Sequence, residues 1–247
     1  MSLTTYARFE LIRTFRNRRF VIFSFGFPLA LYFAVAGPNR HELDLGGSGI
    51  SAPVYFMTSL AAFGAMNSVL AIGARIAAER SAGWNRQLRL TPLSTRTYFR
   101  VKVMTAYATA LGTIAALYIA GAFLGVRLGA GHWIEMTGLL LVGLVPFAAI
   151  GIVLGLLLTS DSIGPAMGGT TALLGLLGGV WFPIAAHGAM HAIAEGLPSY
   201  WLVQAAHVGI GGSAWGPTGW AVVAAWAVAA ALIAGRAYRR DNERPSA

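Results

Sequence analysis

The stretch RIAAERSAGWNRQLRLTPLSTRTYFRVK, residues 75–102, decides how the rest of the chain is organised. It holds seven basic residues and lies between two long apolar runs, 54–74 and 103–126. Charge is scarce elsewhere, because the 247 residues are 56% hydrophobic and only 11% charged. Soluble domains carry about 25% charged residues. The composition therefore indicates a membrane-embedded chain, and the basic stretch indicates a connector that stays in water.

Six apolar segments are long enough to cross a bilayer, which takes about 20 helical residues. They are 20–36, 54–74, 103–126, 133–158, 163–186 and 218–235. The first contains Pro28, which a membrane helix tolerates when a neighbour satisfies the carbonyl that proline leaves without a donor. We predict an all-α integral membrane fold with six transmembrane helices in a single domain, 1–247.

Basic residues are distributed unevenly among the connectors. Five lie before the first span, seven in the connector 75–102 and four after the sixth span, which leaves only Arg40 and Arg127 elsewhere. The positive-inside rule then predicts that both termini and the connector face the cytoplasm. The net charge of +9 is explained by topology, so we expect no nucleic-acid partner.

The sequence carries few groups for catalysis or energy conversion. It has no cysteine, and its only lysine, Lys102, does not follow a glycine as a Walker A motif requires. We therefore predict no catalytic residue, cofactor site or metal site in the chain itself. The spans hold almost no ionisable group at mid-depth, which weighs against a proton- or sodium-coupled carrier.

The outer segment 187–217 is too apolar for a free loop, so we expect short helices that dip into the outer leaflet. Within HGAMHAIAE, three polar residues are spaced i, i+4 and i+8 and would share one helical face: His187, His191 and Glu195. This face is either a polar surface turned to water, which we favour, or a metal site. Gly188 stands where H-E-x-x-H has its glutamate.

Polar residues inside the second and third spans have two interpretations. They form hydrogen bonds between helices, or they line a cargo path. The candidates for the path are Asn67, Tyr107, Thr113 and Tyr118. Three glycine pairs with small-xxx-small spacing favour tight packing, within the chain or across a dimer. They are Gly151 and Gly155, Gly164 and Gly168, and Gly175 and Gly179.

The connector itself predicts a helix over Arg80–Thr91, in which Trp84 and Leu88 share a face. Pro92 ends that helix, and a second one starts near Ser94, a suitable N-cap. The residues alone leave two possibilities open. The helix lies on anionic lipid, or its apolar face docks into a groove of a cytoplasmic partner.

The motif ER-x2-G-x4-L-x2-TPLS resembles the loop between spans two and three of ABC type-2 permeases, the membrane subunits of bacterial ATP-driven exporters. RTFRNRRF followed by a proline-containing span, GGVWFP at the end of span five, and Leu197-Pro198 with the aromatic residues after it are similar to the family in the same order. The resemblance covers nearly the whole chain.

The resemblance implies a permease that exports a hydrophobic or amphiphilic cargo, such as a drug, a lipid or a lipid-linked molecule, from a bacterial cell membrane. It implies two cytoplasmic ATP-binding subunits, which hold ATP and Mg, and a second permease subunit that makes a homo- or heterodimer. Residues 2–17 would form an interfacial helix, and a coupling helix would contact the ATPase. The coupling residues would be Glu79, Arg80, Gly83, Trp84, Leu88, Thr91, Pro92 and Leu93.

Two alternatives from other classes stay open. One is a membrane-embedded lipid-modifying enzyme that uses the histidine face. The other is a secondary carrier, which would respond to collapse of a proton gradient and not to loss of ATP.

Overall fold

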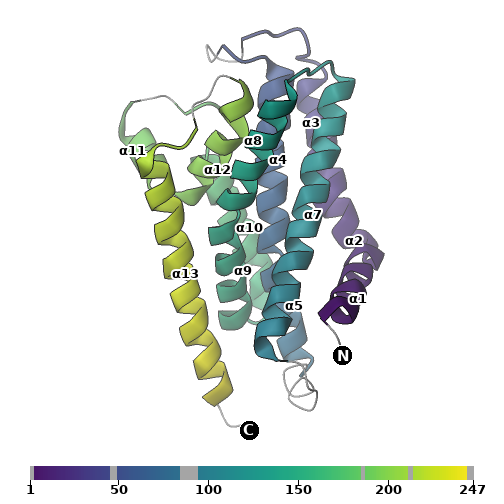
Figure 1. Ribbon diagram of the computed structural model, residues 1–247, viewed down its shortest axis with the longest axis vertical. Coiled ribbons are helices and arrows are strands. Elements are labelled where there is room, and N and C mark those ends of the chain that lie inside the picture. Colours follow the sequence, from purple (N-terminus) through teal and green to yellow (C-terminus); the bar gives the residue numbers. More distant parts are fainter. Residues whose placement is uncertain (1–2, 45–48, 84–93, 185–186, 211–213, 244–247) are drawn as a thin grey trace.

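The computed structural model describes residues 3–44, 49–83, 94–184, 187–210 and 214–243, and every regular element in these ranges is a helix (Figure 1). This confirms the all-α class for the described residues. The elements are α1 (Leu3–Arg16), α2 (Arg18–Val21), the π-helix η1 (Ile22–Gly26), α3 (Phe27–Ala36), α4 (Ala52–Leu70), α5 (Ile72–Ser81), α7 (Thr95–Phe123), α8 (Ala130–Gly143), α9 (Val145–Leu157), α10 (Ser160–Leu177), α11 (Ala189–Glu195), α12 (Pro198–His207), η3 (Val208–Ile210) and α13 (Pro217–Glu243).

Four helical stretches are long and apolar enough to cross a membrane: Ala52–Ser81, Thr95–Phe123, Ala130–Leu157 and Pro217–Arg240. A shorter apolar stretch covers Ile22–Ala36. At 1.5 Å rise per residue, each long stretch exceeds the roughly 30 Å of a bilayer core. The helix α10 is also 18 residues long, but its polar start lowers its hydropathy.

The centre of the bundle is α4, which is buried on nearly all sides. It packs along α7 and also contacts α3, α9 and α12, whereas α13 lies at the edge against α9 (Figure 1). Buried hydroxyls of α4 bond back to its own carbonyls, as when Ser68 Oγ donates to the Gly64 oxygen at 2.9 Å. Polar groups in this core are therefore satisfied without water.

The first apolar stretch bends at Pro28, directly after the π-helix η1. Proline has no N–H, so the carbonyl of Ser24, four residues earlier, lacks its helical donor. The hydroxyl of Thr113 on α7 donates to that carbonyl at 3.3 Å. The neighbouring helix thus supplies the partner that the sequence requires for Pro28.

Two boundaries differ from the prediction. The connector is shorter than 75–102, because α5 continues to Ser81 and α7 already begins at Thr95. The span predicted over 163–186 is too long, because α10 ends at Leu177 and Gly179 adopts a positive φ of 79°. The predicted N-cap at Ser94 is confirmed, since its hydroxyl accepts the Thr97 N–H at 3.2 Å.

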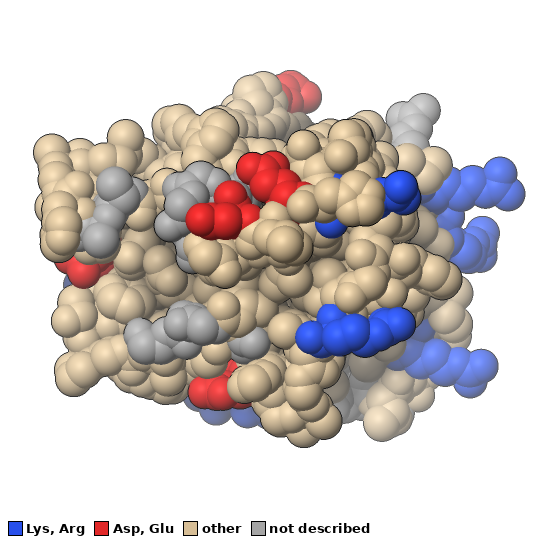
Figure 2. Space-filling view, turned by 90° about the horizontal axis from the view of Figure 1, so that it is seen from above, with Lys and Arg blue, Asp and Glu red and all other residues tan. Residues whose placement is uncertain are grey.

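The bundle has two chemically different ends. Both termini, the end of α5 and the start of α7 lie together, and we call this the terminal end (Figure 1). The opposite end, which we call the α11 end, carries acidic side chains on a mostly uncharged surface (Figure 2). The acidic residues there are Glu42, Asp44, Glu135 and Glu195. All but two of the 18 basic residues belong to the segments of the terminal end.

Candidate functional site

The predicted coupling residues are divided between a helix end and the connector after it. Glu79 and Arg80 lie in the last turn of α5. Gly83 follows with a positive φ of 71°, so a helix that starts at Arg80 does not continue through it. The remaining candidates lie outside the described residues: Trp84, Leu88, Thr91, Pro92 and Leu93.

A buried ion cluster joins three helices directly below that connector. Lys102 on α7 is 1% exposed, and its Nζ lies 2.5 Å from Glu10 Oε1 on α1 and 2.6 Å from Glu79 Oε1 on α5. Arg13 Nη1 lies 3.0 Å from the same Glu79 oxygen. The Tyr98 hydroxyl donates to the second oxygen, Glu79 Oε2, at 2.6 Å. We call these five residues the Lys102 cluster.

The Lys102 cluster is electrically balanced, since two carboxylates face one ammonium and one guanidinium. Burial makes this balance matter, because an unpaired charge in a low-dielectric site is far more costly than a paired one. Nearby Tyr6 is buried against the cluster, and burial, with the charges of Glu10 and Glu79, raises its pKa. Its phenol therefore stays neutral and adds no third negative charge.

Further contacts extend the cluster along α1 and α5. Arg75 Nη1 donates to Thr14 Oγ1 at 2.6 Å, and its guanidinium stacks 4.3 Å from the ring centre of Phe20. On the other side of α5, Arg80 Nη1 donates to the Gly155 carbonyl at 3.0 Å. Helix α5 is thus held on one side to α1 and α7 and on the other to the end of α9.

Close backbone packing strengthens the contact between α5 and α9. A Cβ on Gly155 would lie 2.6 Å from the Gly73 oxygen, and one on Gly151 would lie 3.0 Å from the Leu70 oxygen. The predicted tight packing of this glycine pair therefore occurs within the chain. Gly164 and Gly168 on α10 instead face open space.

The four cargo-path candidates do not line one common path. The Thr113 hydroxyl serves the Ser24 carbonyl, and Asn67 Nδ2 donates to the Phe63 carbonyl within its own helix at 3.1 Å. Tyr107 donates to the Leu141 carbonyl at 3.1 Å, and the Tyr118 hydroxyl lies 3.4 Å from Thr137 Oγ1. Both tyrosines therefore bond to α8. These contacts favour the helix-packing interpretation.

The outer histidine face is only partly assembled. Helix α11 begins at Ala189, after Gly188 with φ of 109°, so His187 lies outside the helix and off the predicted face. His191 Nε2 and Glu195 Oε1 do share a face, 3.4 Å apart. Within the described ranges, no group of three or more His, Cys, Asp or Glu side chains is placed to hold a metal ion.

The arrangement at the terminal end suits mechanical work better than chemistry. The Lys102 cluster presents no nucleophile to solvent, and its charges are consumed by one another. It connects the helix that enters the 82–94 connector, the helix that leaves it and the amino-terminal helix. A force applied to the connector therefore reaches all three helices together.

Known proteins place this architecture in context. No protein-family model matches the chain. The chain is 29% identical over 201 residues to a protein named "Putative transport permease YvfS" from Bacillus subtilis (strain 168), an alignment that covers 77% of this chain and 78% of that protein. This chain belongs to the ABC-2 type transport permease family. It is a transport subunit rather than an enzyme, and its several apolar helices make it a multi-pass membrane protein.

Sequence reasoning missed most of the permease's Lys102 cluster. Glu79 was a coupling candidate, but Glu10, Arg13, Tyr98 and Lys102 were assigned no role. One signal was available: the sole lysine follows Ser94, the predicted helix start, by two turns and so enters an apolar span. A charge at that depth calls for a partner.

Proposed function

We propose that this permease is the membrane subunit of an ATP-driven exporter, and that the Lys102 cluster transmits the motion of a cytoplasmic ATPase to the spans. The observation that carries the proposal is the buried bridge from Lys102 to both Glu10 and Glu79. Membership of the permease family supports an ATP-binding partner.

The proposed topology has six crossings with both termini in the cytoplasm. The four long stretches account for four of them. The amino terminus lies at the terminal end and α4 starts at the α11 end, so residues 18–36 have to traverse the bundle (Figure 1). The same argument applies to α10, because α9 finishes at the terminal end and α11 lies at the other. The basic residues of the terminal end support its cytoplasmic placement.

The proposed assembly contains two ATP-binding subunits, which hold ATP and Mg, and a second permease subunit. Helix α1 would lie at the cytoplasmic interface beside the connector, and α11 and α12 would dip into the outer leaflet. Export from a bacterial cell membrane fits this orientation. A hydrophobic or amphiphilic cargo fits the apolar spans.

The docking role of the connector is tested by Trp84→Ala combined with Leu88→Ala. We expect the double variant to insert normally but to lose stimulation of the partner ATPase and ATP-dependent transport in proteoliposomes. The matched control is Trp220→Ala with Ile134→Ala, which removes a similar exposed apolar area at the α11 end. Full ATPase stimulation by the connector variant would overturn the proposal. Transport that stops on collapse of a proton gradient, and not on loss of ATP, would assign a carrier instead.

A further inference from the structure

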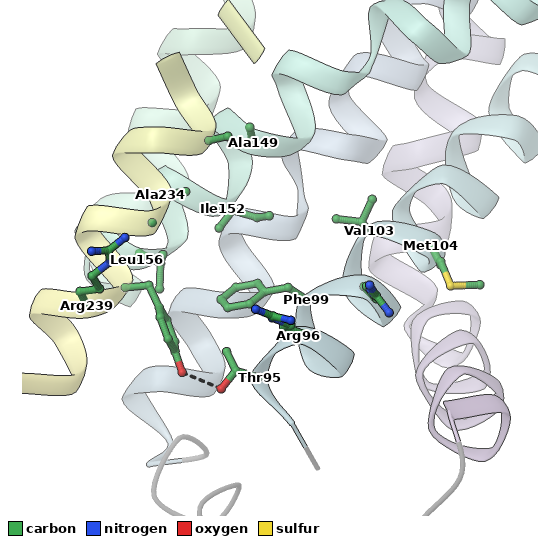
Figure 3. A pocket seen from close by; sticks show the side chains of 14 residues that line it. Thr95, Arg96, Phe99, Val103, Met104, Ala149, Ile152, Leu156, Ala234 and Arg239 are labelled. Atoms are coloured by element: carbon green, nitrogen blue, oxygen red, sulfur yellow. Dashed lines mark hydrogen bonds between the residues drawn. The ribbon is translucent and has the colours of Figure 1, made fainter. Parts of the chain in front are cut away.

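A cleft opens between α7, α9 and α13 near the terminal end, away from the Lys102 cluster (Figure 3). Its volume is about 940 Å³, at the upper end of the range of small-molecule sites, roughly 300–1,000 Å³. A hydrogen bond of 2.7 Å between Thr95 Oγ1 and the Tyr238 hydroxyl joins α7 to α13 at the cleft. The ring of Phe99 packs edge-on against Tyr238.

The cleft is amphipathic along its length. Its walls are aliphatic, with Val103 and Met104 from α7 and Ile152 and Leu156 from α9. Arg96 and Met104 are eight residues apart, which is about 12 Å along a helix. That is most of the roughly 15 Å that one leaflet contributes to the hydrocarbon core. The cleft therefore has the depth to take the upper part of an acyl chain.

Three arginines line the cleft and lack a counter-charge. They are Arg96 and Arg100 on α7 and Arg239 on α13, and all three are exposed. Across the described ranges, none of them forms an ion pair with a carboxylate. Arg96 and Arg100 are i, i+4 neighbours, so like charges are held side by side. An anion at this position would relieve that repulsion.

We propose that this cleft binds an anionic phospholipid from the leaflet at the terminal end. The guanidinium groups would take the phosphate, for which their planar, bidentate geometry is suited. One acyl chain would lie along Val103, Ile152 and Leu156. Basic pockets between spans on the cytoplasmic side are a recurrent means of holding anionic head groups. The inference requires only that α7, α9 and α13 are embedded in the membrane, so it stands apart from the ATPase partnership.

The test is native mass spectrometry of the full chain released from mild detergent, with added phosphatidylglycerol and phosphatidylcholine compared at equal concentration. We expect the wild-type chain to retain phosphatidylglycerol selectively. Arg96→Gln with Arg239→Gln should weaken retention about 25-fold, since each arginine near a membrane surface contributes about fivefold. Arg236→Gln with Arg240→Gln is the matched control, because these arginines do not line the cleft.

A steric variant separates the cleft from general surface charge. A Cβ on Gly235, which lines the cleft, meets no heavy atom within 4 Å, so Gly235→Leu occupies the cleft without strain and keeps every arginine. We expect this variant to lose phosphatidylglycerol as well. Retention at the wild-type level, or equal loss in the control pair, would overturn the proposal. So would competition by millimolar inorganic phosphate, or loss of a second copy of the chain in place of lipid.

Discussion

The two ends of the permease hold their helices together by different means. At the terminal end, Lys102, Glu10 and Glu79 form a buried ionic bridge among three helices. At the α11 end, neutral indole N–H groups donate to carbonyls. Trp201 Nε1 lies 2.8 Å from the Glu195 oxygen, and Trp226 Nε1 lies 2.9 Å from the Gly196 oxygen.

The difference teaches what each end is built to do. The two tryptophans satisfy carbonyls at the end of α11, which an α-helix leaves without intrahelical donors. Such bonds are local and do not depend on net charge. The ionic bridge instead depends on all of its members, because removal of one leaves another charged and buried. The α11 end is therefore fixed piece by piece, and the terminal end responds as a unit.

The largest effect is expected at Lys102. Lys102→Met leaves Glu10 without a cation and Glu79 with Arg13 alone, which should destabilise the protein by about 3–5 kcal/mol. The melting temperature of the detergent-purified protein measures this. The control is Arg16→Gln, an exposed basic residue of α1. A shift no larger than that of the control would mean that the bridge is not an energetic unit.

A smaller effect is expected where α5 packs on α9 at the terminal end. Gly155→Ala places a Cβ 2.6 Å from the Gly73 oxygen, so the helices must separate, at a cost of about 1–3 kcal/mol. Gly164→Ala, which faces open space, should be neutral or stabilising by up to about 1 kcal/mol. Thermal unfolding of the two variants measures the contrast, and equal melting temperatures would contradict the close contact.

The smallest effect is expected at the α11 end. Trp226→Phe removes one donor to the Gly196 carbonyl and should cost about 0.5–1.5 kcal/mol. Hydrogen exchange should rise in α11 and stay unchanged in α5 and α7. Trp220→Phe is the control, because its indole has no hydrogen-bond partner in the described part of the chain. Faster exchange throughout the bundle would blur the distinction between the ends.

The sequence predicts the features that depend on neighbouring residues. Composition indicates the all-α membrane class, the serine before α7 marks its N-cap, and Pro28 calls for an external donor. The coupling role of Trp84 and Leu88 stays a prediction. What fails is whatever relies on assumed helix continuity, as for His187, which Gly188 separates from α11.

The Lys102 cluster was beyond sequence reasoning for a different reason. Glu10 and Lys102 are 92 residues apart, and nothing local says that α1 packs against α7. The apolar residues of α1 follow the helical period imperfectly, so the burial of Glu10 is not visible in the pattern. Only the arrangement of the three helices brings the opposite charges together.

The central claim is that Glu10 and Lys102 act as a pair between α1 and α7. A double-mutant cycle with Glu10→Gln, Lys102→Met and both together tests it most directly, because the Arg13–Glu79–Tyr98 contacts remain in every variant. We predict that the double variant is more stable than the sum of the single losses implies, with a coupling energy of about 0.5–3 kcal/mol. Strict additivity, within about 0.5 kcal/mol, would contradict the account.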